Sequence, residues 1–143
     1  MAKMIFVNLP VGDLARANAF YQAIGATKNE QFCDETASCM VFSETIHAML
    51  LTHDKFRPST PKKIADARTS SEVLICISAD SREVVDDMVG KAKAAGGIAD
   101  PSPKQDFGFM YGRSFEDPDG HIWEVMWMDV EAASKAHAAP VHA

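Results

Sequence analysis

The stretch from Gly108 to Met128 constrains the fold most, because it predicts two strands joined by a tight turn. In the turn, Asp-Pro-Asp-Gly at 117–120, the proline fixes φ at the first central position and the glycine can take a positive φ. After the turn, Ile122, Glu124 and Met126 share one strand face and alternate with larger or β-branched neighbours. Glu124 therefore lies in mid-strand among apolar side chains. A charge there is costly unless it is paired, binds a metal or faces water.

The rest of the chain repeats one order of elements, a strand, a helix and three strands, in each half. The strands are predicted at 4–10, 26–31, 36–43, 46–52, 72–79, 97–101, 107–116 and 121–128. The helices are predicted after Asp13 and Asp80, each ending at a glycine. We therefore expect an α+β fold of two βαβββ modules, 4–52 and 72–128, within a single domain, 1–129. Each sheet has one face behind its helix, and the free faces can curl around a shared cavity.

Two segments lie outside the modules. The connection 53–71 is polar and contains two prolines, which fits either a lid over the cavity or a plain linker with a helical turn near 62–67. The tail 130–143 is rich in alanine, and we expect it to be flexible.

Charge and composition exclude several classes of function. The formal net charge is −6 and the lysines and arginines are scattered, which argues against binding to nucleic acid or to an anionic membrane surface. No apolar run approaches the roughly 20 residues that span a bilayer, and the first residues lack the apolar core of a signal peptide. The three cysteines show no CxxC spacing. Reduced thiols and a cytoplasmic location are therefore expected.

Two phrases carry a family resemblance. The opening FVNLPVGDLARANAFYQAIG at 6–25 and the closing FEDPDGHIWEVMW at 115–127 resemble the first strand and helix and the last hairpin of the vicinal oxygen chelate superfamily. That superfamily includes the glyoxalases, bleomycin-resistance proteins and extradiol dioxygenases. With SSEV at 70–73 and GFMYGRSF at 108–115, the chain is similar to small bacterial glyoxalase-like members. The resemblance covers 4–128 and implies a cupped mixed sheet around a cavity and a homodimer.

The resemblance also implies where a metal would bind. Metal-dependent members take ligands from the first, fourth, fifth and eighth strands, and these positions fall at Phe6, Leu50, Glu72 and Glu124. Of these four residues, only Glu72 and Glu124 have side chains that can act as metal ligands. They could hold Mg²⁺ or Mn²⁺ with waters but would make a poor zinc or nickel site. His47 points to the opposite face from Leu50 by its spacing. We therefore expect no complete family metal site, and no bound metal as cofactor.

Five residues are the candidates for contact with a ligand: Phe6, Asn8, Leu50, Tyr111 and Arg113. The last two could offer a hydroxyl and a guanidinium to an anionic or phenolic ligand, or could serve packing and a surface ion pair. Arg113 could alternatively neutralise Glu124 across the hairpin. His121, beside Trp123, is expected to be structural or to lie at a dimer surface.

Two functions remain open at this stage. The first is a metal-free protein that binds a small organic molecule, as bleomycin-resistance proteins do. The alternative is a lyase or isomerase of the glyoxalase type, with Glu124 and Glu72 as metal ligands or as an acid–base pair. A dioxygenase is less expected, because the two-histidine, one-carboxylate set is absent. Neither a GxGxxG after a strand nor a P-loop occurs, so no nucleotide cofactor is expected. A purely structural module would leave Glu124 unexplained.

Overall fold

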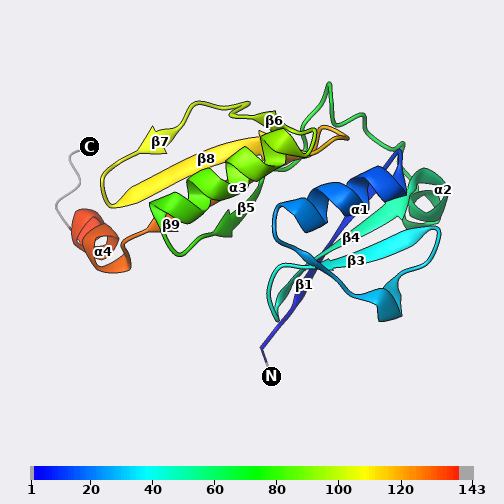
Figure 1. The fold of residues 1–143 in the computed structure, drawn as a ribbon, viewed down its shortest axis with the longest axis horizontal. Helices are drawn as coiled ribbons and strands as arrows, with labels where there is room; N and C mark the ends of the chain where they lie inside the picture. The colour runs from blue at the N-terminus through cyan, green and yellow to red at the C-terminus, as the bar shows by residue number, and fades with distance from the viewer. Residues whose placement is uncertain (1, 139–143) are drawn as a thin grey trace.

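The computed structural model describes residues 2–138 and places two helices over the same side of two mixed sheets (Figure 1). The strands are β1 (Ile5–Val11), β2 (Thr27–Lys28), β3 (Ala37–Val41), β4 (Ile46–Thr52), β5 (Ile75–Ser78), β6 (Ile98–Ala99), β7 (Gln105–Asp106), β8 (Met110–Glu116) and β9 (Ile122–Met128). The helices are α1 (Leu14–Ala23), α2 (His53–Phe56), α3 (Arg82–Ala94) and α4 (Val130–Ala138), with short 3₁₀ turns at Glu30–Phe32 and Arg57–Ser59. No helix within residues 2–138 is both long and apolar enough to cross a bilayer.

The two sheets share one topology. The first runs in the order β1-β4-β3-β2, and the second in the order β5-β9-β8-β6, with β7 also pairing with β8. In each, the first strand of the module is parallel to the last, and the remaining pairs are antiparallel. The predicted α+β fold of paired βαβββ modules is therefore confirmed. The strands β1 and β5 lie at sheet edges, so the combined sheet is not closed.

Local sequence explains how the two long helices begin and end. The Asp13 side chain caps α1 by accepting from the backbone N–H three residues on, at 3.0 Å. Gly25 ends α1 with φ of 112°. Helix α3 is capped by Ser81, which accepts at 3.2 Å from the backbone N–H three residues later, so the predicted cap at Asp80 is wrong by one residue. A side-chain cap therefore fixes the first turn of each helix.

A shared core joins the modules behind the sheets. Phe20 and Tyr21 of α1 reach across to Phe115 and Trp123 of the second module, with ring centroids 6.0 and 5.9 Å apart. All four side chains are at most 1% exposed. A Cβ on Gly97 would lie 2.8 Å from the Phe20 ring and 2.4 Å from a backbone oxygen, so only glycine fits at this contact. The contact therefore holds the first module's helix against the second module's sheet.

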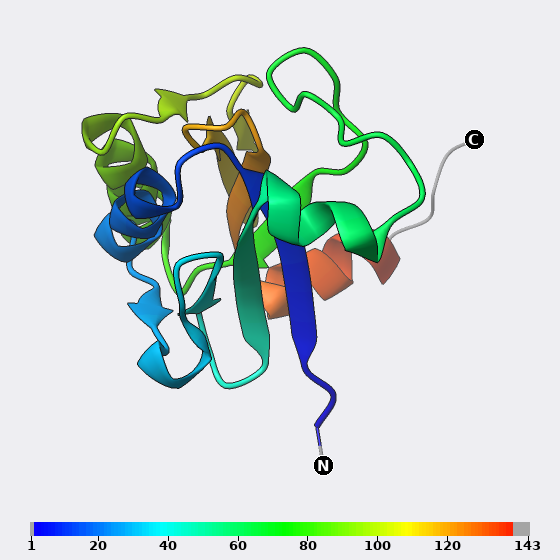
Figure 2. The ribbon, with the colours of Figure 1, turned by 90° about the vertical axis from the view of Figure 1, so that its right-hand side faces the viewer.

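The other face of the sheets is open. In β1, Leu9 and Val11 are buried beneath α1, whereas Phe6 and Asn8 are exposed on the opposite face. Seen end-on, α1 and α3 lie on one side of the sheets, and the connection that follows α2 lies on the other (Figure 2). The free faces are therefore available for function, as the alternation in the sequence predicts.

Several predicted details differ from the structure. Strand β5 begins at Ile75, so Glu72 precedes it instead of starting it. The helical turns of the connection lie at 53–59 and not at 62–67, because Thr52 supplies a side-chain cap to the Lys55 N–H. The predicted strand 26–31 is only two residues long and passes into a 3₁₀ turn. Residues 130–138 form α4 in place of a flexible tail, and 139–143 lie outside the described residues.

Candidate functional site

Glu124 lies on the open face of the second sheet, between Cys76 on β5 and Ser114 on β8. It is half-buried and lines a recess of about 90 Å³. That volume suits a few waters, whereas pockets for organic ligands measure roughly 300–1,000 Å³. Burial and the negative charge of Glu124 both raise the pKa of the Cys76 thiol. The recess alone is therefore too small for an organic ligand.

Tyr111 and Arg113 lie on the opposite face from Glu124, beneath α3. The Arg113 guanidinium contacts Asp100 at 2.7 Å and Asp86 at 2.9 Å, and the Tyr111 hydroxyl donates to Asp86 at 2.6 Å. The hydrogen bond with Asp86 raises the pKa of Tyr111, and the guanidinium lowers the pKa of Asp100. The prediction that Arg113 neutralises Glu124 is therefore wrong, and the ion-pair alternative describes this residue.

The ligand candidates of the first module are divided between the two faces. Phe6 stacks on His47 across β1 and β4, with ring centroids 4.5 Å apart and an interplanar angle of 16°. Asn8 is exposed on the same open face. Leu50 is 0% exposed within the core on the α1 side, so it cannot touch a ligand on the open face. His47 and Leu50 do lie on opposite faces, as their spacing predicts, but Leu50 faces the core and His47 lies beside Phe6 on the open face.

A cavity of about 260 Å³, here called the junction cavity, lies where the two modules meet the connection. From the strands it is lined by Asn8, Pro10 and Ile122, from the connection by Phe56 among others, and from the segment before β5 by Glu72. Its lining combines apolar side chains with a few polar and charged groups, as in ligand sites generally, and Lys62 and Lys63 line it as well as a larger cavity that adjoins it. The structure therefore brings Asn8 and Glu72 together at one cavity, whereas Glu124 lines a different one.

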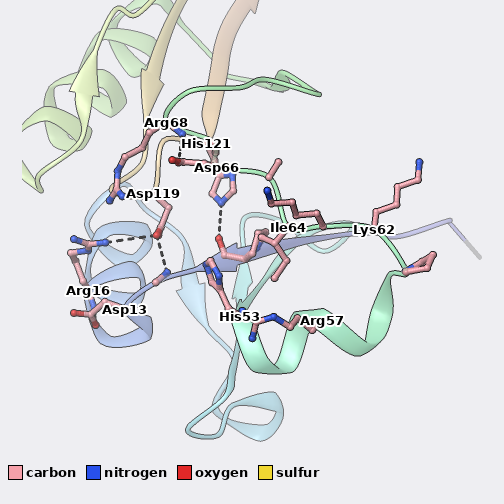
Figure 3. Close-up of a pocket in the computed structure, with 16 residues that line it drawn as sticks. Asp13, Arg16, His53, Arg57, Lys62, Ile64, Asp66, Arg68, Asp119 and His121 are labelled. Atoms are coloured by element: carbon pink, nitrogen blue, oxygen red, sulfur yellow. Dashed lines mark hydrogen bonds and ion pairs between the residues drawn. The ribbon is translucent and has the colours of Figure 1, made fainter.

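A second, larger cavity of about 830 Å³, here called the basic cavity, adjoins the junction cavity (Figure 3). It lies between the start of α1, helix α2, the segment 61–68 and the end of the hairpin turn. His121 lines both cavities, and its Nε2 lies 2.8 Å from the Pro10 carbonyl oxygen, which gives it the predicted structural role. Five cationic residues line the basic cavity: Arg16, Arg57, Lys62, Lys63 and Arg68. Four of them lie in the connection, a sequence signal that the search for carboxylates and histidines missed.

A family model described as the Glyoxalase/Bleomycin resistance protein/Dioxygenase superfamily matches residues 3–125. The chain belongs to this superfamily. No curated protein gives a significant sequence match.

Several solved structures share the fold. A hypothetical protein from S. aureus, SA1046, is 25% identical with a TM-score of 0.73, and the match covers 89% of this chain and 94% of that one. A family enzyme from Burkholderia phytofirmans PsJN is 19% identical with a TM-score of 0.71, covering 89% and 99%. The fosfomycin resistance protein FosX from Listeria monocytogenes is 19% identical with a TM-score of 0.65, covering 92% and 97%.

The structure separates the residues at the four positions where the sequence resemblance implies that a metal would bind. Within residues 2–138, no group of three or more His, Cys, Asp or Glu side chains is placed to hold a metal ion. Phe6 has no donor atom and Leu50 is buried in the core. The two remaining positions, Glu72 and Glu124, line different cavities. Two carboxylates that share one divalent cation must lie close together, whereas Glu72 and Glu124 line separate cavities.

Proposed function

We propose that this chain binds a small organic molecule in the junction cavity and does so without a complete family metal site. The observation that carries the proposal is that both modules and the connection contribute lining residues to one cavity. Ile122 and Phe56 offer apolar surface, while Asn8 and Glu72 offer an amide and a carboxylate. Such a lining suits a ligand with an apolar body and one or two hydrogen-bonding groups.

The glyoxalase-type alternative is less favoured on geometric grounds. A lyase or isomerase that uses Glu124 and Glu72 together requires both carboxylates near one reacting atom. Glu72 lines the junction cavity, while Glu124 lines the small recess on β9. Acid–base exchange between them would require a large rearrangement.

We also propose that two copies form a homodimer through the open strand edges. Met4, Ile5 and Phe6 expose 45–56% of their surface at the β1 edge. Exposed apolar residues on the free edge of a sheet favour association with another surface. Phe6→Glu should therefore shift the mass measured by light scattering toward the monomer. The three free cysteines are consistent with the cytoplasm as the site of action.

Ligand-observed NMR with a library of neutral fragments tests the binding proposal. Ile122→Trp fills the junction cavity and should abolish saturation transfer to fragments that bind the parent chain. Val130→Trp adds the same side chain at a position that is 71% exposed and outside the cavity, so it should leave binding unchanged. Fragments that bind equally to both variants would place binding elsewhere and contradict the proposal.

A further inference from the structure

The basic cavity concentrates positive charge in a chain whose net charge is −6. Five cationic residues and three carboxylates line it, so its balance is opposite in sign to that of the whole molecule. A concave surface with one sign of excess charge raises the local concentration of counter-ions. The cavity therefore favours anions, although the protein as a whole repels them.

The three carboxylates of the cavity are already engaged with protein donors. One oxygen of Asp13 accepts from the backbone N–H of Arg16 at 3.0 Å, and one of Asp66 accepts from that of Arg68 at 3.0 Å. An oxygen of Asp119 accepts from a backbone N–H at 2.8 Å and lies 3.7 Å from the Arg16 guanidinium. Its other oxygen is buried and faces no solvent. These contacts occupy one oxygen of each carboxylate, and Arg16 pairs with one of the three carboxylates.

The cationic side chains keep much of their hydrogen-bonding capacity. Arg57 pairs with Asp54 at 2.6 Å, but these side chains are 62% and 96% exposed, so the pair contributes little and can be given up. Arg68 donates from one nitrogen to a carbonyl oxygen at 2.8 Å, which leaves other N–H groups. His53 and Arg57 lie on one side of the hollow and Arg16 on another, whereas Lys62 extends away from its centre (Figure 3).

We infer that the basic cavity binds a small organic anion through a phosphate or carboxylate group held by Arg57, while Arg16 adds positive charge from another side of the cavity. Guanidinium groups match these oxyanions in geometry and keep their charge at any physiological pH. The volume of about 830 Å³ lies within the range of small-molecule sites and exceeds the needs of a single inorganic ion. This site goes beyond the junction cavity, and the inference stands whether or not that cavity holds a ligand.

Isothermal titration of the full chain with inorganic phosphate, and separately with succinate, tests the inference. Arg57→Gln should weaken binding by about tenfold, because one charge-assisted contact is lost. Lys93→Gln removes the same charge from an exposed position on α3 and should change the affinity little. Circular dichroism should show that both variants fold, since neither side chain is buried.

The outcomes separate the sources of the anionic group. Binding of phosphate alone assigns the cavity to phosphorylated molecules, and binding of succinate alone assigns it to carboxylates; either supports the site. No saturable binding of either anion, or equal weakening by Arg57→Gln and Lys93→Gln, would overturn it. Ile122→Trp should leave phosphate affinity intact, so failure of the junction-cavity proposal is recognised independently. Loss of phosphate binding in Ile122→Trp would place the anion in the junction cavity and refute the basic-cavity site.

Discussion

Tyr21→Phe should destabilise the fold far more than the loss of one oxygen suggests. The Tyr21 hydroxyl donates to a carboxylate oxygen of Asp117 at 2.5 Å and accepts from the Trp123 indole N–H at 2.9 Å. The three residues are 0%, 3% and 1% exposed. Removing the hydroxyl leaves a buried carboxylate oxygen and a buried N–H without a hydrogen-bond partner, because water cannot replace the lost group.

The magnitude follows from the two bonds. A hydrogen bond to a charged group contributes about 1.5–3 kcal/mol and a neutral one about 1 kcal/mol, so Tyr21→Phe should cost about 3 kcal/mol. That is a large part of the roughly 5–15 kcal/mol that stabilises a typical domain. Urea unfolding followed by tryptophan fluorescence measures it, with an unchanged denaturant slope as the check on two-state behaviour.

Tyr111→Phe is the matched control. It removes the same hydroxyl from a single bond to Asp86, whose side chain is 52% exposed and can turn to water. Its cost should therefore stay near or below about 1 kcal/mol. Equal costs for Tyr21→Phe and Tyr111→Phe would refute the view that the buried network holds α1 to the hairpin.

The same network predicts a pH dependence. Burial raises the pKa of Asp117 above its ordinary value of 3.8, while the hydrogen bond from Tyr21 acts to lower it. Protonation of Asp117 thus adds stability that is complete below pH 3.8 and is lost as pH rises through the raised pKa. Tyr21→Phe removes the bond that favours the carboxylate, so its cost should shrink as the pH falls. A cost that grows on acidification would contradict this assignment.

Three further predictions concern the turn, an ion pair and the metal question. In Gly120→Ala, the residue must keep a φ of 94°, and its Cβ lies 2.7 Å from the backbone of the connection. In Gly25→Ala, φ is 112° but nothing lies within 4 Å of the Cβ, so Gly120→Ala should lower the thermal unfolding midpoint more than Gly25→Ala does. Because Arg113 lowers the pKa of Asp100, this ion pair stabilises the fold fully above pH 3.8, and the stabilisation is lost as the pH falls through the lowered pKa. Arg113→Met should therefore make the free energy of unfolding depend less on pH in the acid range. Glu124→Gln should leave metal content unchanged in elemental analysis, and a lost equivalent would revive the metal-dependent reading.

Regular periodicity made most of the fold predictable. The strand 46–52 and the helix after Asp13 were placed closely, because alternation and a capping side chain act locally. The start of β5 was misplaced, because Glu72 and Val73 continue an apolar-polar pattern although no neighbouring strand pairs with them. Strand ends depend on partners far along the chain, which one sequence does not reveal.

The candidate site was predictable only where strand parity decides it. Parity put Ile122, Glu124 and Met126 on one strand face, but it could not show that Arg113 would pair with Asp86 of α3 and with Asp100 of a loop. The basic cavity could not be predicted from the sequence, because its lining residues come from segments far apart in the chain. The cluster of cations between Arg57 and Arg68 was its one local sign.

The turn 117–120 also explains why the connection stays close to both modules. Its first carboxylate accepts from Tyr21 of the first module, and its proline carbonyl accepts from Arg68 of the connection at 2.8 Å. Its second carboxylate accepts from the backbone N–H of Gly12, where β1 passes into α1. His121, just after the turn, lies 2.8 Å from the end of β1 through its Nε2. A segment that looks like a local reversal therefore joins three parts of the chain, and both cavities depend on it for their shape.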